Sequence, residues 1–259
     1  MQKMLKKSTV DEIIAKLTAA REKAKAEGYV APAEQRSPRD IAKAEKADLF
    51  TRRLVVLRSL LSWIPAPDKR ALEDYVCESD EQRRAVAIVR RFAERFLDRV
   101  VDDEHASAGI ILVGTPGTGK TRLALSALTL LAESGAPGFF ISASEYFDLY
   151  TPAFSSKLDA PLTKIRSLLA GVSCLVIDDV GTAAWTDARR DRLQQILDMR
   201  SADHLPTIIT TNLTRGDFAQ EGAERITSRF DQLLYPIVAT WPDYRKRVAL
   251  KSRPMEDIF

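Results

Sequence analysis

The feature that most constrains this chain is the stretch GTPGTGKT at residues 114–121. Gly114 and Gly119 enclose four residues and are followed by Lys120 and Thr121, which completes the phosphate-loop pattern G-x-x-x-x-G-K-[ST]. The glycines let the backbone turn tightly, so that several N–H groups point into one anion-sized hollow. The lysine supplies charge to the β- and γ-phosphates, and the threonine hydroxyl binds Mg²⁺. The residues expected to hold ATP are Gly114, Thr115, Pro116, Gly117, Thr118, Gly119, Lys120 and Thr121.

The segments on both sides of this loop have the patterns that a phosphate loop requires. A short apolar run at 108–113 has the character of a strand, and apolar residues then recur at helical spacing over 123–131. A strand, a glycine loop and a helix N-terminus together hold a phosphate through the helix dipole and the unpaired N–H groups. This context favours a nucleotide site over an ordinary glycine-rich turn.

From residue 109 onward, strand and helix patterns alternate, which predicts an α/β fold with a parallel sheet flanked by helices. The expected further strands are 139–142, 172–177, 206–211 and 237–239, and the expected helices include 143–149, 162–169 and 193–199. With the phosphate loop, this alternation indicates the fold of a P-loop nucleoside triphosphatase.

Residues 1–78 differ from the rest, because their patterns are helical and contain no catalytic motif. Apolar residues from Val10 to Leu17 lie on one face of an expected helix, and a longer helical segment follows at 41–61. We predict a separate all-helical N-terminal module at 1–78 and an ATPase domain at 79–259. Two roles remain open for the module: a cap that packs on the core, or an arm that docks a partner.

Bulk properties predict a cytoplasmic protein with no membrane association. The net charge is only +3, and no apolar run approaches the roughly 18 residues that span a bilayer. The N-terminal residues have no apolar segment of the kind found in secretory signals. Cys77 and Cys174 lie far apart, which excludes a cysteine-based zinc module and suggests reduced thiols.

Two carboxylates, Asp178 and Asp179, follow the apolar run 174–177. The carboxyl end of a buried parallel strand is where ligands bind in an open α/β sheet. We expect Asp178 to hold Mg²⁺ together with Thr121, and Asp179 to orient or deprotonate the attacking water.

Polar residues at two later positions could complete such a site. Asn212 ends the strand at 206–211, where its amide could contact the γ-phosphate or the water, although a turn-initiating asparagine is the alternative. Arg225 and Arg229 lie four residues apart, on one face of an expected helix. An arginine offered to the γ-phosphate of a neighbouring subunit would stabilise the transition state, and a solvated basic face is the alternative.

The motifs GTPGTGKT, CLVIDDVG, TIITTN, ERITSRF and WPDYRKR, in this order, resemble those of the DnaC-type helicase loaders. These are AAA+ ATPases close to the replication initiator and to the IstB-like transposition ATPases. The resemblance covers roughly residues 80–250 and does not extend to residues 1–78.

The resemblance implies an AAA+ ATPase, dependent on ATP and Mg²⁺, that binds a hexameric replicative helicase and helps place it on single-stranded DNA. It also implies self-association through an arginine that acts on a neighbouring subunit, here Arg229 with Arg225 as a second candidate. Arg245 would serve as a second sensor of the nucleotide. The family has no large helical lid after the core.

In these relatives single-stranded DNA lies against an insertion before the acidic strand, here residues 143–170, and on the helix that follows Asp179. An aromatic side chain among basic ones suits base stacking and phosphate binding. For Phe154 a core position is the alternative. The candidate DNA contacts are Phe154, Lys157, Lys164, Arg166, Trp185, Arg189 and Arg190.

One departure from the family pattern concerns catalysis. Many AAA+ proteins have glutamate where this chain has Asp179, and the shorter arm predicts weak basal hydrolysis that a partner stimulates. Two other functions stay open: an IstB-like ATPase that assists a transposase on DNA, and an adaptor in which ATP is a structural ligand.

Overall fold

The computed structural model describes residues 37–102, 109–152, 160–182 and 184–244. Its contacts divide the chain into two compact units, residues 1–42 and 43–259. The described part of the first unit is the start of helix α2 (Pro38–Leu60), where the Ser37 hydroxyl accepts a hydrogen bond from the Asp40 backbone N–H at 3.1 Å. The helix predicted around Val10 lies outside the described residues.

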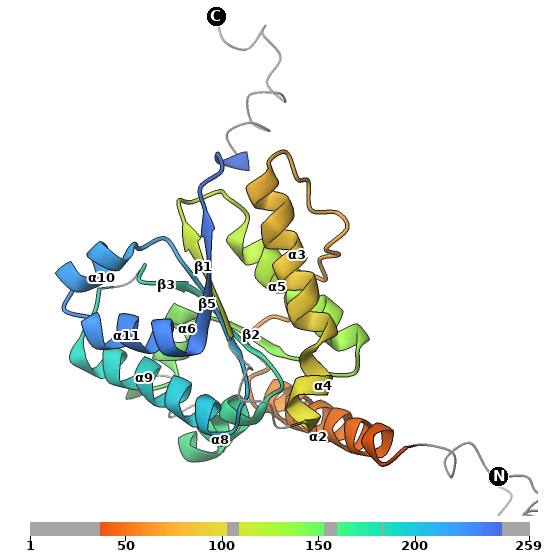
Figure 1. Cartoon of the computed structure of the whole chain (residues 1–259). Coiled ribbons are helices and arrows are strands. Elements are labelled where there is room, and N and C mark those ends of the chain that lie inside the picture. Colours follow the sequence, from red (N-terminus) through yellow and green to blue (C-terminus); the bar gives the residue numbers. More distant parts are fainter. Residues whose placement is uncertain (1–36, 103–108, 153–159, 183, 245–259) are drawn as a thin grey trace, which may run out of the picture. The chain divides into compact units, whose positions relative to one another are not determined.

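The second unit is built on a five-stranded parallel sheet (Figure 1). Its strands are β1 (Gly109–Gly114), β2 (Phe139–Ser142), β3 (Leu175–Val180), β4 (Thr207–Thr211) and β5 (Leu234–Ala239), in the order β2-β3-β4-β1-β5. The predicted parallel α/β fold is therefore confirmed. The order places β4 between β3 and β1, so the residues that follow these three strands meet at one edge of the sheet.

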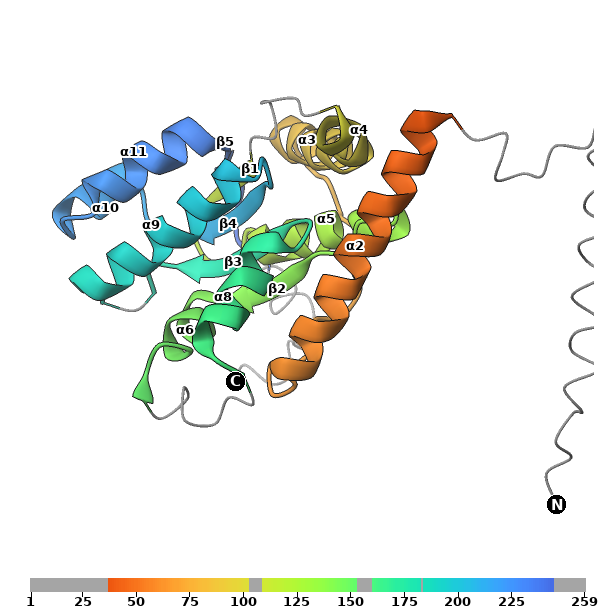
Figure 2. The ribbon, with the colours of Figure 1, turned by 90° about the horizontal axis from the view of Figure 1, so that it is seen from below.

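Helices cover both faces of this sheet. Figures 1 and 2 show α3 and α5 on one face and α6, α8, α9 and α11 on the other. The bounds are α3 (Asp80–Glu94), α4 (Phe96–Val101), α5 (Lys120–Glu133), α6 (Ala143–Asp148), α8 (Leu162–Gly171), α9 (Asp187–Ala202), α10 (Arg215–Gln220) and α11 (Glu224–Leu233). None of the helices in the described ranges has both the length and the apolar composition to cross a membrane.

The apolar core lies on both sides of the sheet, because successive strand residues point to opposite faces. Ile110 and Leu112 join the cluster beneath α3 and α5, whereas Ile111 joins Ile177 and Ile209 in the cluster beneath α8, α9 and α11. Strands buried on both faces read as continuous apolar runs, which is why their positions could be predicted from the sequence.

The residues between 43 and 78 pack into the same unit as the sheet. Phe50 and Leu72 are buried in the cluster beneath α3 and α5, and Leu57 and Leu61 are buried in the opposite one. The structure therefore divides the chain between Ala42 and Lys43, whereas the sequence patterns predicted a boundary between residues 78 and 79. The reason is that α2 buries Phe50 and Leu57 in the core of this unit, and helical spacing alone does not show which surface a helix covers. The docking role of residues 1–78 stays a prediction.

Candidate active site

The loop between β1 and α5 has the conformation that its glycines predict. Gly117 and Gly119 adopt left-handed backbone angles, with φ of 81° and 85°. A Cβ atom at residue 119 would lie 2.9 Å from the hydroxyl oxygen of Tyr75, so a side chain there would displace its neighbour. The N-terminus of α5 begins at Lys120, directly after this turn. The loop therefore presents the unpaired N–H groups of a helix start, which is a site for an anion.

The Lys120 ammonium is fixed between the loop and the end of β4. Its Nζ atom donates hydrogen bonds to the carbonyl oxygens of Gly114 and Thr115, both at 2.8 Å, and to Asn212 Oδ1 at 2.7 Å. The residue is only 6% exposed. The structure thus brings together the predicted lysine and the predicted asparagine, which are far apart in the sequence.

Asp178 lies half-buried at the end of β3, opposite the start of α5. Its carboxylate accepts hydrogen bonds from Thr121 Oγ1, at 3.0 and 3.2 Å, and from Thr210 Oγ1 at 2.6 Å. Burial raises the pKa of Asp178 above its ordinary value, and the hydrogen bonds from Thr210 and Thr121 oppose that shift.

The predicted metal ligands, Thr121 and Asp178, are therefore adjacent. Mg²⁺ prefers hard oxygen donors and is commonly held by one or two carboxylates together with substrate phosphates. The Thr121 hydroxyl and the Asp178 carboxylate are oxygen donors that fit a Mg²⁺ ion held together with substrate phosphates. Within the described ranges no cluster of three or more His, Cys, Asp or Glu side chains could hold a metal without such phosphates.

Asp179 stands at an irregularity in β3. The register between β3 and β4 shifts between Ile177 and Val180, and Asp179 has a φ of 61°. Its backbone N–H donates to Thr210 Oγ1 at 2.8 Å, and its Oδ1 atom accepts from Asn212 Nδ2 at 3.1 Å. A left-handed residue that is not glycine is most often asparagine or aspartate. The local backbone thus gives a physical reason for aspartate, rather than glutamate, at this position.

A cleft of about 650 Å³ extends from these residues along the phosphate loop. Its lining includes residues that the sequence patterns did not predict, among them Tyr75 and Trp241. The Tyr75 hydroxyl and the Trp241 ring N–H both donate to the Thr118 carbonyl oxygen, at 3.0 and 2.6 Å, and the Tyr244 N–H donates to the Gly117 carbonyl oxygen at 3.0 Å. Burial raises the pKa of Tyr75 to about 12, so this phenol stays protonated as a donor. Segments that precede the loop in sequence (Tyr75) and follow it (Trp241 and Tyr244) therefore both stabilise its conformation.

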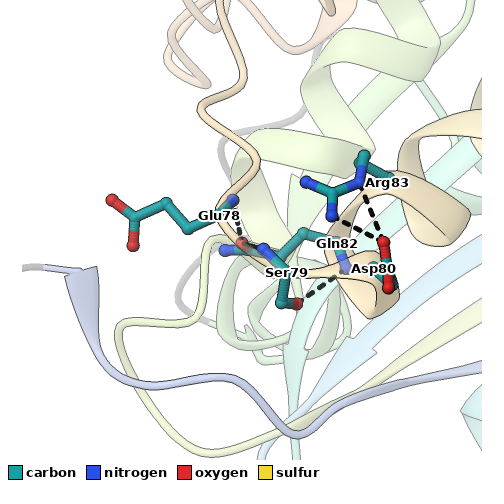
Figure 3. A network of polar contacts seen from close by, with 5 residues as sticks. All are labelled: Glu78, Ser79, Asp80, Gln82 and Arg83. Carbon is teal, nitrogen blue, oxygen red and sulfur yellow. Dashed lines mark hydrogen bonds and ion pairs between the residues drawn. The ribbon is translucent and has the colours of Figure 1, made fainter.

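Hydrogen bonds of a helix cap fix the start of α3 (Figure 3). The Gln82 side-chain oxygen accepts from the backbone N–H groups of Glu78 and Ser79, at 2.6 and 3.0 Å, and Ser79 Oγ accepts from the Gln82 N–H at 3.2 Å. This is a capping box at the start of α3. Since Gln82 also lines the cleft, the cap positions the segment that follows Tyr75. The sequence signal that could have revealed it is the S-x-x-Q pattern at 79–82.

The two candidate arginines lie on α11, away from this cleft. Neither Arg225 nor Arg229 is among the residues that line it. Arg225 is exposed, and Arg229 forms an ion pair with Asp198 on α9, with Nε and Oδ1 2.9 Å apart, while its Nη1 donates to Gln232 at 2.9 Å. Neither arginine therefore contributes to the cleft of its own chain in this structure. Arg245 lies outside the described residues.

Four of the predicted DNA contacts are basic residues on α8 and α9, which pack against each other. Lys164 is exposed, Arg166 donates to Gln195 at 3.1 Å, and Arg189 lies 5.5 Å from the centre of the Phe147 ring. Arg190 pairs with Asp187 at the start of α9, with Nη2 and Oδ1 2.7 Å apart.

The aromatic candidates have a different status. The Trp185 ring is half-buried and packs against Phe218, with 5.7 Å between ring centres. A stacking pair that the predictions missed is Arg192 over Tyr150, 4.6 Å from the ring centre. Phe154 and Lys157 lie outside the described residues.

Known proteins resemble this chain both in sequence and in fold. The family model described as IstB-like ATP binding protein matches residues 39–234. The replicative helicase loader DnaC of Escherichia coli K12 is 26% identical over 190 residues, which are 73% of this chain and 74% of that protein. The corresponding DnaC of Buchnera aphidicola from Schizaphis graminum is 26% identical over 180 residues, covering 69% of this chain and 70% of that protein.

Solved structures give the same result. The crystal structure of the DnaC helicase loader matches with a TM-score of 0.56 and 28% identity, over 66% of this chain and 96% of that one. The crystal structure of DnaI matches with a TM-score of 0.55 and 25% identity, over 66% of this chain and 91% of that one. AMPPCP-bound DnaA from Aquifex aeolicus shares the fold, with a TM-score of 0.55 at 18% identity over 71% of this chain and 55% of that one. The resemblance to DnaC-type AAA+ proteins is confirmed.

Proposed function

Because the chain belongs to the family of IstB-like ATP-binding proteins, we propose that it is an ATP-dependent helicase loader. In this proposal it binds a hexameric replicative helicase and single-stranded DNA, and helps place the helicase on the DNA. The observation that carries the proposal is the similarity to the replicative helicase loader DnaC, which spans about three quarters of both chains. The proposed parts of this machinery are the nucleotide cleft and the helices α8 and α9.

The cleft is suited to ATP because its lining combines charged and apolar groups. The helix N-terminus and the Lys120 ammonium attract the charged triphosphate. Tyr75, Val76 and Leu125 in the same lining offer aromatic and apolar surface for a base. We propose that the triphosphate takes over the hydrogen bonds that Lys120 now gives to carbonyl oxygens and to Asn212.

Hydrolysis follows from the residues at the ends of β3 and β4. Thr121 and Asp178 would hold Mg²⁺, which neutralises charge on the phosphates. Asp179 would orient or deprotonate the attacking water, and Asn212, bonded to Asp179, would contact the γ-phosphate or that water. Since Asp179 has a short arm, we propose weak basal activity that single-stranded DNA or the helicase stimulates.

Arg229 is proposed to complete the site of a neighbouring subunit. Its side chain is 38% exposed and lies outside the cleft of its own chain. An arginine supplied from another subunit stabilises transition-state charge during phosphoryl transfer. This requires self-association in the active form. Arg225 is the second candidate for the same role, and Arg245 is proposed as a second sensor of the nucleotide.

Single-stranded DNA is proposed to bind along α8 and α9. Lys164, Arg166, Arg189 and Arg190 would contact phosphates, and Tyr150 would add a stacking surface. Phe154, Lys157 and Trp185 are proposed as further DNA contacts.

The second candidate is an ATPase that assists a transposase on DNA. The description of the matching family model favours it, because that description is IstB-like. The test is to mix the purified chain with the replicative helicase of its own organism, with ATP and Mg²⁺, and separate complexes by size-exclusion chromatography. A stable complex supports the loader. A chain that elutes separately from the helicase but together with a transposase supports the second candidate.

A further inference from the structure

We infer that Thr210 is a positioning residue that holds both acidic residues of the site, Asp178 through its carboxylate and Asp179 through its backbone N–H, with a single hydroxyl group. The inference rests on the proposed ATPase function and adds to its site a residue whose role no motif defines. Thr210 is in β4, directly beside β3, and is 1% exposed. Its Oγ1 atom lies 2.6 Å from Asp178 Oδ1 and 2.8 Å from the Asp179 backbone nitrogen.

The direction of both hydrogen bonds follows from the chemistry of the groups. A backbone N–H can only donate, so Thr210 Oγ1 accepts from Asp179. An ionised carboxylate can only accept, so the single hydroxyl hydrogen of Thr210 is donated to Asp178. The Thr210 hydroxyl therefore acts as a hydrogen-bond donor and as an acceptor at the same time. Valine has nearly the same shape but supplies neither bond, whereas serine supplies both.

The first bond fixes the backbone at the irregularity in β3. Asp179 has a left-handed φ of 61°, and the strand register shifts at this point. A backbone N–H that leaves the sheet ladder needs another acceptor, because an unpaired polar group away from water is costly. Thr210 provides that acceptor. The position from which the Asp179 carboxylate approaches a water molecule therefore depends on Thr210.

The second bond fixes the carboxylate on the metal side. Asp178 also accepts from Thr121, at 3.0 Å. However, Thr121 is itself a proposed Mg²⁺ ligand, so Thr210 is the partner whose bond does not compete with metal binding. Partners that orient a metal-binding carboxylate matter almost as much as the ligand, and their loss commonly lowers metal affinity about 10- to 100-fold.

The test compares Thr210→Val and Thr210→Ser in the full chain. Isothermal titration with ATP at a series of Mg²⁺ concentrations gives the Mg²⁺ dependence of nucleotide affinity without using the hydrolysis rate. We expect Thr210→Val to need about 10- to 100-fold more Mg²⁺ for the same ATP affinity, and Thr210→Ser to stay close to the wild type. If the valine variant does not fold, Thr210→Cys replaces it, because a thiol is a much weaker donor and acceptor.

A matched control lies at the other end of the same strand. Thr207 is 4% exposed, and its hydroxyl accepts from Arg200 Nε at 3.0 Å. Thr207→Val removes a buried hydroxyl of β4 away from the cleft, so it should lower the melting temperature and leave the Mg²⁺ dependence unchanged. A purely structural role of Thr210 would make the two valine variants alike, and that result would overturn the inference.

The Asp178→Asn variant distinguishes failure of the inference about Thr210 from failure of the proposed function. If Asp178→Asn changes the Mg²⁺ dependence and Thr210→Val does not, the inference is wrong and the metal assignment stands. If neither variant changes it, the proposed nucleotide–metal site is wrong. If Thr210 acts through Asp178, Thr210→Val should have no further effect on the Mg²⁺ dependence in the Asp178→Asn background, and two additive losses would overturn the inference.

Discussion

Replacing Asp179 by asparagine and by glutamate separates its chemical role from its conformational one. Asparagine keeps the short arm and an oxygen that can accept from Asn212, but removes the charge and the basicity. Glutamate keeps the carboxylate but adds a methylene group at a backbone position with a φ of 61°. The two variants should therefore fail in different ways.

The magnitudes follow from the geometry at this residue. The left-handed conformation costs ordinary L-residues about 1–2 kcal/mol and costs aspartate or asparagine less. Asp179→Glu should thus lower the free energy of unfolding by about 1 kcal/mol, which lowers the melting temperature by about 2–4 °C in a domain of this size. Asp179→Asn should keep the wild-type melting temperature. A positioned base contributes about 10²- to 10⁴-fold to rate, so this variant should hydrolyse ATP at least about 100-fold more slowly.

The assay is single-turnover ATP hydrolysis in the presence of helicase and single-stranded DNA, together with thermal denaturation of each variant. Asp48→Asn, which removes an exposed carboxylate paired with Arg52 on α2, controls for loss of a negative charge. A wild-type rate in Asp179→Asn would refute the assignment of Asp179 to the water. A glutamate variant as stable as the wild type would refute the conformational explanation.

Three further outcomes are expected. Arg229→Ala should lower stimulated hydrolysis with ATP affinity unchanged, whereas Asp198→Ala, which frees the guanidinium, should not; mixing experiments in which Arg229→Ala matches the wild type would contradict a role across subunits. Arg200 is fully buried, which lowers its pKa to about 10, and it donates hydrogen bonds to five carbonyl oxygens and a threonine hydroxyl. Arg200→Met should therefore lower the free energy of unfolding, measured by urea titration, by more than about 3 kcal/mol. Because burial raises the pKa of Asp178, its ionisation opposes folding, so the stability of the wild type relative to Asp178→Asn should fall as pH rises above about 4 in denaturation series; a relative gain would contradict this sign.

Much of the fold and the centre of the site could be predicted from the sequence, because both depend on short-range patterns. The apolar run at 174–177 is followed by two carboxylates, the strand pattern at 206–211 is followed by Asn212, and parallel topology brings such ends to one edge. Strand patterns alone therefore predict that Lys120, Asp178 and Asn212 lie near one another. The hydrogen bond of 2.7 Å between Lys120 and Asn212 agrees with that prediction.

The remaining parts depend on packing between distant segments, which no local pattern encodes. Tyr75 and Trp241 meet at one carbonyl oxygen of the phosphate loop, although they lie on opposite sides of it in the sequence. Arg200 resembles the other arginines of α9 in sequence, and only the carbonyl oxygens around the end of α8 explain its burial. The packing of α2 against the core is another contact between distant segments, and it places the division of the chain between Ala42 and Lys43 instead of after residue 78.

The most direct test of the proposed loader is placement of the replicative helicase on closed circular single-stranded DNA, which has no end for a ring to thread. The measurement is the amount of helicase that stays on the circle after removal of unbound protein, with and without this chain, ATP and Mg²⁺. The account predicts a marked increase that needs both the chain and ATP and is lost in Lys120→Ala. Helicase bound equally with and without the chain would contradict it.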